Sequence, residues 1–215
     1  MPHTVRHSHR STFKIYFIFT FYINLESKKV SQIFHPIIRE ALKEQKLEMP
    51  QIEITTLTDD QIADLREHQI GYVSQFLKAE PRRGVKEIVI KSAIKKGIDE
   101  AIADEMAAAI LTKLNIDESL WGTYPTLLSG GEKQRVNLAA GIVVPPILLL
   151  LDEPVSALDR KNREAVLQVI LILAEDNTTI LSVFHDLDAM IRLADRVVVL
   201  SKGKVIDQGH PEEVI

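Results

Sequence analysis

Two neighbouring acids, Asp152 and Glu153, directly follow the apolar run Ile147–Leu151. Such a run between Pro145-Pro146 and Pro154 predicts a strand buried on both faces of a parallel sheet. A carboxylate at the carboxyl end of a parallel strand is well placed to hold Mg²⁺, usually through water. The adjacent acid is then placed to activate a water molecule as a general base. The alternative, common for any Asp-Glu pair, is a strand that simply stops in a charged turn.

A second group of polar residues lies in the string Leu128-Ser-Gly-Gly-Glu-Lys-Gln-Arg135. Alanine and leucine spacing predicts a helix from Gly131 to about Val144. Ser-Gly-Gly at the start of a helix presents backbone N–H groups, a hydroxyl and the positive end of the helix dipole to an anion. A glycine-bearing helix cap without a ligand is the alternative for a bare Ser-Gly-Gly.

Three further positions gain interest from their order along the chain. Gln75 follows a short predicted strand, Ile70–Val73, and Asp159 ends the string Ser156-Ala-Leu-Asp. His185 follows a second predicted buried strand, Thr178–Val183, and lies 32 residues after Glu153. Each has an ordinary alternative, namely a surface glutamine, a helix N-cap and a histidine at the end of a strand.

Taken in order, these motifs resemble the ABC-type ATPase (ATP-binding cassette) domain. The resemblance implies a P-loop NTPase-like α/β fold, with a parallel sheet flanked by helices and a helical signature subdomain. It implies the cofactors ATP and Mg²⁺, with a metal role for Asp152 and Gln75. It implies catalytic roles for Glu153 as general base, His185 at the γ-phosphate and Gln75 at the attacking water. Nucleotide contacts of the signature motif and D-loop would come from Ser129, Gly130, Gly131, Glu132 and Asp159.

Local strings resemble one branch of this family in particular. They are Tyr72–Leu77, Leu114–Ile116 with Leu120-Trp121, Arg135–Leu138 and Phe184-His185-Asp186. Together they resemble the ATP-binding subunit of the phosphonate carbon–phosphorus lyase system, whose family activity is ATP hydrolysis. The stretch Val197–Ile215 is equally typical of transporter ATPases. An ATP-binding subunit of an ABC transporter is therefore the alternative.

The P-loop of the family, G-x-x-x-x-G-K-[ST], lies upstream of the Q-loop glutamine and wraps backbone amides round the phosphates. The first glycine in this sequence is Gly71, so residues 1–70 contain no form of that loop. The cluster Ser27-Lys28-Lys29 lacks the necessary backbone freedom. We therefore expect an incomplete ATP site. Asp152 and Glu153 would lie in it, but no P-loop would bind the phosphates of the nucleotide.

The N-terminal region differs in composition from the rest. Residues 1–49 form an atypical segment not matched to the family, and residues 50–215 a partial ABC ATPase domain, with the helical signature subdomain over about 77–145. The aromatic run Phe13–Leu25 suits a strand better than a membrane anchor, because it is short for a span and contains Lys14. Loss of the strand before the P-loop removes a central member of the sheet, and replacement of that strand by Phe13–Leu25 is the less favoured outcome.

Other elements follow from periodicity and caps. Helices are expected at 99–114, 160–174 with Asp159 as cap, about 186–194 and, as a short charged helix, 36–48. A β-hairpin is expected from Val197–Leu200 and Lys204–Ile206. Strands alternating with helices predict an α/β domain.

Composition restricts the partners. The net charge of −4 gives no reason to expect nucleic acid, and the absence of cysteine fits a cytoplasmic protein. The resemblance implies another ABC ATPase subunit, in a homo- or heterodimer, with other subunits of the phosphonate system and only indirect membrane association. Three hypotheses stay open: a defective ATPase, a non-catalytic partner that offers its signature motif to another subunit's ATP, and a misassigned start of a longer, active protein.

Overall fold

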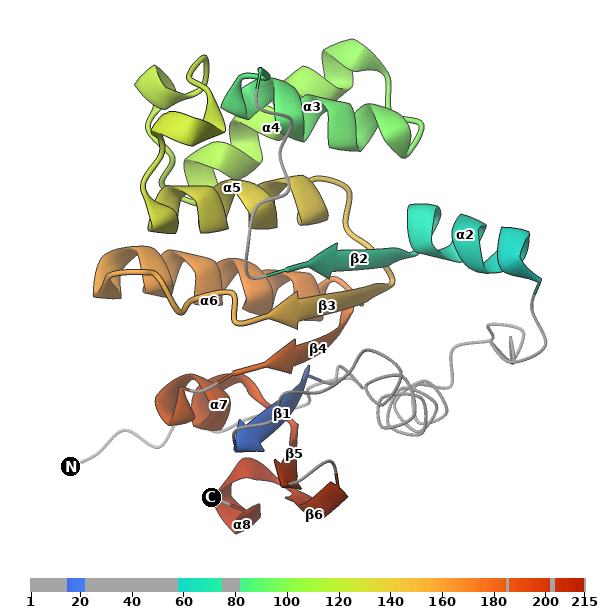
Figure 1. The fold of residues 1–215 in the computed structure, drawn as a ribbon, viewed down its shortest axis with the longest axis vertical. Coiled ribbons are helices and arrows are strands. Elements are labelled where there is room, and N and C mark those ends of the chain that lie inside the picture. The colour runs from blue at the N-terminus through green and yellow to red at the C-terminus, as the bar shows by residue number, and fades with distance from the viewer. Residues whose placement is uncertain (1–14, 22–57, 75–81, 185, 202–203, 215) are drawn as a thin grey trace.

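The computed structural model describes residues 15–21, 58–74, 82–184, 186–201 and 204–214 (Figure 1). The strands are β1 (Ile15–Phe21), β2 (Ile70–Val73), β3 (Leu148–Asp152), β4 (Thr179–Val183), β5 (Arg196–Ser201) and β6 (Lys204–Gly209). The α-helices are α2 (Asp59–His68), α3 (Val85–Lys95), α4 (Glu100–Lys113), α5 (Gly130–Ile142), α6 (Arg160–Glu175), α7 (Leu187–Leu193) and α8 (Pro211–Val214). Two 3₁₀ turns, η2 (Glu118–Leu120) and η3 (Pro125–Leu127), lead into α5.

All six strands form one sheet, in the order β2-β3-β4-β1-β5-β6. Every pairing is parallel except the β5–β6 hairpin, which is antiparallel. In Figure 1 the strands descend from β2 at the top to β6 at the bottom. The predicted α/β fold with a largely parallel sheet is therefore confirmed.

The N-terminal strand β1 lies in the middle of this sheet. Ile15 pairs with Ile180 of β4, and Tyr16 pairs with Arg196 of β5. The prediction that Phe13–Leu25 suits a strand is confirmed for Ile15–Phe21, whereas the central position of this strand is an outcome that the sequence analysis disfavoured. Without β1, the backbones of β4 and β5 would lose their shared neighbour, because each of them pairs with β1 along one side.

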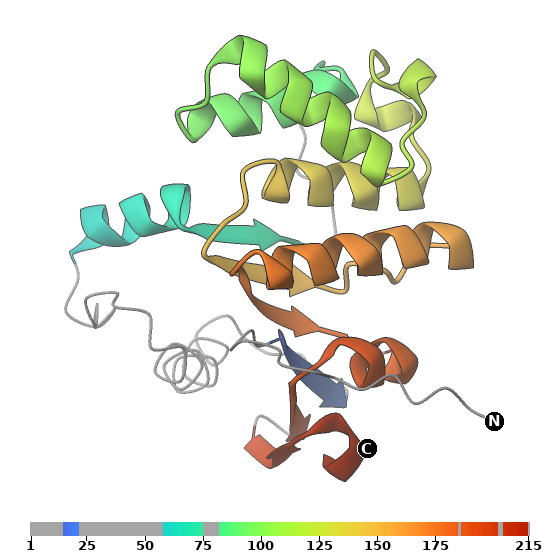
Figure 2. The same cartoon turned by 180° about the vertical axis from the view of Figure 1, so that it is seen from behind.

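Alternate strand residues and the helices α6 and α7 build the hydrophobic core. Leu149, Leu151 and Ile180 are almost fully buried and share one core cluster with residues of both helices. Helix α6 buries apolar residues at helical spacing, at Val166, Leu167, Val169, Ile170 and Leu173. Figure 2 shows α6 running across the sheet.

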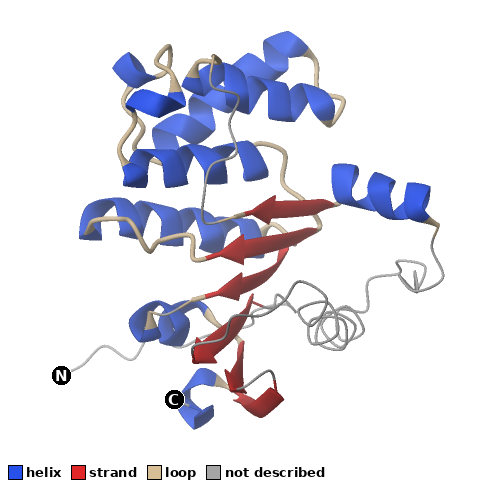
Figure 3. Ribbon diagram, viewed as in Figure 1, coloured by secondary structure: helices blue, strands red, loops and turns tan. Residues whose placement is uncertain are grey.

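Helices α3, α4 and α5 form a separate helical layer beyond β2 (Figure 3). Helix α3 was not predicted, although Val85, Val89 and Ala93 are spaced by four residues and are all fully buried. Helix α5 approaches β2 closely at Gly141, where an added Cβ would lie 2.5 Å from Val73 Cγ2. The layer agrees with a helical subdomain, while its bounds at 77 and 145 remain a prediction.

The other predicted elements are found within one or two residues of their expected ends, except that β6 ends at Gly209, three residues beyond the predicted Ile206. Asp99 caps α4 through an Ala101 amide 2.9 Å away, and Asp159 and Asp186 cap α6 and α7. Helix α2 was missed, although Thr58 and Gln61 form a capping box at its start. The predicted helix over 36–48 and the hairpin tip at 202–203 lie outside the described residues. Among the helices that the structure describes, none is long and apolar enough to cross a membrane.

Candidate functional site

The signature motif forms the first turn of α5. Ser129 is the N-cap, and its hydroxyl accepts a hydrogen bond from the Glu132 amide at 3.3 Å. The Glu132 carboxylate in turn accepts bonds from the Ser129 amide and hydroxyl, each at 2.7 Å. Ser129 and Gly130 are exposed, and an added Cβ on Gly130 would meet nothing within 4 Å. The helix-cap alternative is therefore confirmed, and nucleotide binding by this exposed turn remains a prediction.

The capping bonds also set the electrostatics of this turn. Hydrogen bonds from Ser129 hold the pKa of Glu132 below its usual range, with a smaller contribution from Arg135. Glu132 is therefore an anion that the helix N-terminus already stabilises.

The predicted metal and base residues lie at the carboxyl end of β3. Asp152 pairs with Val183 of β4, and the Glu153 amide donates to the Val183 carbonyl at 3.1 Å. Glu153 has a φ of 47°, in the left-handed region that a residue with a side chain seldom adopts. Burial, and then the charge of Asp152, raise the pKa of Tyr72 on the neighbouring strand β2. Asp152 is thus close enough to β2 for its charge to act there.

A buried glutamine that sequence reasoning missed joins α5 to the turn after β3. Gln134 is 3% exposed. Its Nε2 donates to the Glu153 carbonyl at 2.6 Å and to Ser156 Oγ at 3.2 Å, and its Oε1 accepts from the Ala157 amide at 3.2 Å. The string Leu128–Arg135 contained the residue, but nothing in its spacing pointed to these partners.

The D-loop aspartate belongs to a second network centred on Arg135. Asp159 accepts hydrogen bonds from the amide and side chain of Asn162, at 3.0 and 2.6 Å. Asn162 Oδ1 accepts from Arg135 at 2.9 Å, and Arg135 also donates to the carbonyls of Leu114 and Asn115 at 2.9 and 2.6 Å. Arg135 therefore ties the end of α4 and the start of α6 to the signature helix.

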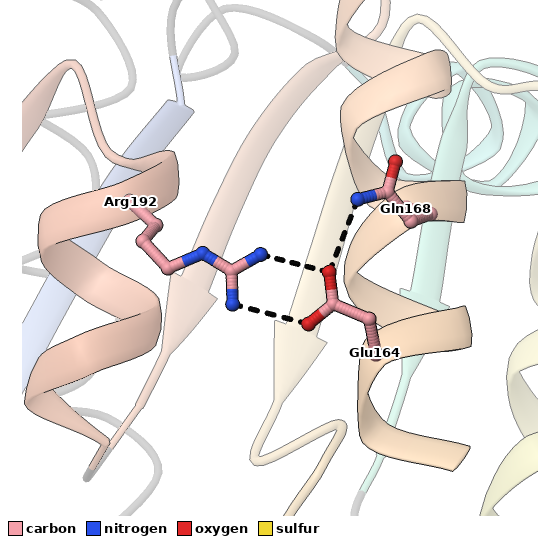
Figure 4. Close-up of polar contacts among 3 residues, drawn as sticks. All are labelled: Glu164, Gln168 and Arg192. Carbon is pink, nitrogen blue, oxygen red and sulfur yellow. Dashed lines mark hydrogen bonds and ion pairs between the residues drawn. The ribbon is translucent and has the colours of Figure 1, made fainter. Parts of the chain in front are cut away.

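Two ion pairs join α7 and its N-cap to α6. The N-cap, Asp186, is the residue after the predicted switch histidine. Asp186 pairs with Arg163 of α6. At the next residue of α6, Glu164 accepts two hydrogen bonds from Arg192 at 2.8 and 3.1 Å and one from Gln168 at 3.1 Å (Figure 4). The hydrogen bonds from Arg192 and then Gln168 lower the pKa of Glu164 to about 2.

Gln75 and His185 themselves lie outside the described residues. Their neighbours are placed: Asn137 of α5 donates to the Ser74 carbonyl at 2.6 Å, and Asp186 is the N-cap of α7. The structure therefore links the signature helix to Glu153 and the D-loop through two hydrogen-bond networks, those of Gln134 and Arg135. Roles for Gln75 and His185 remain predictions.

The residues of the signature turn fit a phosphate group, because an exposed hydroxyl and an open glycine lie at the start of a 13-residue helix. Fit to a metal is less complete. Within the described part of the chain, no group of three or more His, Asp or Glu side chains is arranged to hold a metal ion. Asp152 lies at the carboxyl end of β3, and its Mg²⁺ role remains a prediction.

Comparison with known proteins decides the family. The model of the family described as "ABC transporter" matches residues 35–156, which is more than half of the chain. The chain belongs to the ABC transporter family. This match starts inside the segment 1–49, and the proposed domain boundary at residue 50 remains a prediction.

Curated relatives and solved structures agree with this family. The arginine transport ATP-binding protein ArtM of Bacillus subtilis is 34% identical over 78% of this chain and 72% of its own length. The molybdenum import ATP-binding protein ModC of Pectobacterium atrosepticum is 42% identical over 67% of this chain and 40% of its own length. The ADP- and Pi-bound dimer of the ATP-binding cassette MJ0796 superposes with a TM-score of 0.74, at 25% identity, over 94% of this chain and 87% of that one. The P-loop NTPase-like fold of ABC ATPases is thereby confirmed.

The relatives also bear on the branch of the family. They are ATP-binding proteins of amino-acid, molybdenum and energy-coupling factor transport, so they support the transporter alternative and not the carbon–phosphorus lyase branch. The chain spans about half the length of the first of these relatives, with shares of 46%, 40% and 51%.

Proposed function

We propose that this chain is an ATP-binding subunit of an ABC transporter that offers its signature face to ATP held by a second, P-loop-bearing subunit. The observation that carries the proposal is the exposed, fully capped Ser129–Glu132 turn beside the D-loop. The names of the relatives support a transport role. We place the chain in the cytoplasm, with membrane association only through the transporter's other subunits.

In this arrangement Ser129 and the open Gly130 bind the partner's γ-phosphate, and Asp159 lies at the subunit boundary. ATP supplies the phosphoryl group, and Mg²⁺ neutralises its charge, when both are bound. On its own side, the chain keeps Asp152 as a metal ligand and Glu153 as a base. The 215-residue sequence has no P-loop to grip phosphates, and phosphoryl transfer depends mainly on positioning and electrostatics. We therefore expect weak ATP binding by the chain alone.

Titration of the purified chain with Mg-ATP tests the expectation that the chain alone binds ATP weakly. We expect no saturation below millimolar nucleotide, and micromolar affinity for the isolated chain would contradict the proposal.

A charge placed in the signature turn tests the proposal that this face acts on ATP held by the partner subunit. A tagged chain recovered with its P-loop-bearing partner should support ATP hydrolysis, and Ser129→Arg should abolish it. Thr112→Arg on α4 is the matched control, because it puts the same side chain in place of an exposed hydroxyl far along the chain from the motif. Unchanged hydrolysis with Ser129→Arg would overturn the trans role of this face.

A further inference from the structure

The signature turn and the D-loop meet within this one chain, at Gly131 and Ala157. An added Cβ on Gly131 would lie 3.0 Å from the Ala157 carbonyl oxygen and 3.3 Å from Leu158 Cδ2. The first turn of α5 therefore lies against the loop between β3 and α6, with no room for a side chain between them. A displacement of either segment has to move the other.

Gln134 joins the same two segments by hydrogen bonds. Both ends of its amide are used: Nε2 donates to the Glu153 carbonyl and to Ser156, and Oε1 accepts from the Ala157 amide. The side chain is 3% exposed, so water is not available to replace these partners. Ser156 Oγ also donates to the Glu153 carbonyl, at 3.2 Å.

The turn formed by residues 153–157 needs the support of these Gln134 hydrogen bonds. Glu153 stands in the left-handed region, a conformation that persists when surrounding contacts stabilise it. Among standard side chains of this length, glutamine alone carries a donor and an acceptor on one planar end group. Glutamate keeps only acceptors at neutral pH, and methionine keeps the length but supplies no strong hydrogen bond.

We propose that Gln134 is a positioning residue that makes the signature turn and the D-loop a single rigid contact surface for the partner subunit. The surface consists of Ser129, Gly130, Ser156 and Ala157, which are all exposed. Gln134 acts from beneath it, through its bonds to the turn 153–157. The Arg135–Asn162–Asp159 network extends the same connection to the start of α6. The inference rests on the proposed function for its effect on the partner. The link between Gln134 and the turn 153–157, however, is testable on the chain alone.

Amide hydrogen exchange on the isolated chain tests that link. In Gln134→Met, the Ala157 amide loses its acceptor, so its exchange should speed up about tenfold, which corresponds to the loss of one net hydrogen bond. The amides of Ser129 and Glu132, which donate within the capping box of the signature turn, should follow, because the two segments are packed together. Gln134→Glu keeps the acceptor for Ala157 and should protect that amide better than Gln134→Met does. Gln168→Met, on the exposed side of α6, makes the same chemical change elsewhere and should leave all three amides unaltered.

Hydrolysis by the complex with the P-loop-bearing partner is the second readout. Gln134→Met should lower kcat about tenfold or more, because small displacements of a positioned group are costly, while KM for ATP changes little. If the wild-type chain fails to activate the partner, the proposed function fails, and the exchange result still decides the role of Gln134. If Gln134→Met does not fold, Gln134→Asn, which is too short to reach both loop partners, replaces it. Unchanged exchange at Ala157 in a folded variant would overturn the proposal.

Discussion

Arg135 is a buried cation whose hydrogen bonds go mainly to backbone carbonyls. It donates to the carbonyls of Gly131, Leu114 and Asn115 and to the side chain of Asn162. Burial lowers the pKa of the guanidinium, and the charges of Glu132 and Asp159 oppose that shift. The carbonyls at the end of α4 favour a cation there, because the C-terminus of a helix carries partial negative charge.

Arg135→Met should therefore destabilise the fold strongly. Carbonyl groups left without a donor in a buried site cost more than the net value of the lost bonds, and we expect a loss of about 3 kcal/mol in the free energy of unfolding. Urea denaturation at neutral pH measures this loss. Arg160→Met, at an exposed position in the first turn of α6, is the control and should change stability by less than about 0.5 kcal/mol. Equal effects of the two substitutions would contradict the structural role of Arg135.

At the scale of single residues, the sequence predicted helix caps better than hydrogen bonds between residues far apart in the chain. Ser129 and Asp159 were predicted as caps or nucleotide contacts, and the capping part is now visible because caps act over three residues. The partners of Gln134 and Arg135 lie 19 to 27 residues away for their longer bonds, and no local pattern encodes such pairs. Only the packing of α5 on the loop after β3 brings them together.

Helices α6 and α7 are joined by charges on their exposed sides. The Glu164 carboxylate binds Arg192 through both oxygens, and the two side chains are 46% and 48% exposed. The folded-state pKa of Glu164, about 2, is below its ordinary value of 4.5. A depressed pKa means that the stabilisation is fully present above about pH 4.5 and is lost as the pH falls toward 2.

Glu164→Gln should consequently destabilise the protein at pH 7 but have a shrinking effect in acid. The loss at pH 7 should be about 1 kcal/mol or less, because exposed pairs are screened by water. Urea denaturation of both proteins between pH 7 and pH 3 measures the difference. Glu175→Gln, an exposed acid in the last turn of the same helix, serves as control. A difference that stays constant over this range would show that the ion pair is not its source.

Element prediction succeeded where the pattern was periodic and ended in clear caps. Helix α6 has an apolar face at helical spacing and the cap Asp159, and strands β3 and β4 are short, mostly apolar runs. The bounds of all three agree with the expected ones. Helix α2 was missed because it buries no residue and has only two half-buried larger apolar residues, Ile62 and Leu65, so its cap is the main signal. Its stability comes from local bonds and from the strand that follows, which periodicity does not detect.

On the scale of the whole molecule, the position of β1 connects the two ends of the chain. It is parallel to both β4 and β5, so its backbone N–H groups serve two ladders. A proline in β1 removes a donor and distorts the strand in the middle of a sheet, where proline is seldom tolerated.

Ile18→Pro should therefore abolish cooperative folding and give an aggregating protein. Circular dichroism with thermal denaturation, together with size-exclusion chromatography, measures the outcome. Ile18→Val keeps the backbone N–H and is the matched control, which should fold and stay monodisperse. A cooperative transition in Ile18→Pro at the wild-type temperature would show that β1 is dispensable.

Family and fold were predictable at this scale, whereas the branch was not. The motifs Ser129–Glu132 and Asp152-Glu153 carried the resemblance to the family, and the family comparison confirms that resemblance. The strings that suggested the phosphonate branch lie at strand ends and helix turns, as in Phe184-His185-Asp186, where packing and capping also constrain the residue types. Such positions carry little information about what a subunit transports.

The central place of β1 also sets the order in which this protein is completed during synthesis. Ile15 and Tyr16 leave the ribosome early, yet their pairing residues, Ile180 and Arg196, are translated more than 150 positions later. At synthesis rates of roughly 5–20 residues per second, the strand waits about 10–30 s for its neighbours. An apolar, aromatic segment is thus unpaired through most of translation. Chaperone dependence in the cell should accordingly follow the speed at which the C-terminal third of the chain is translated.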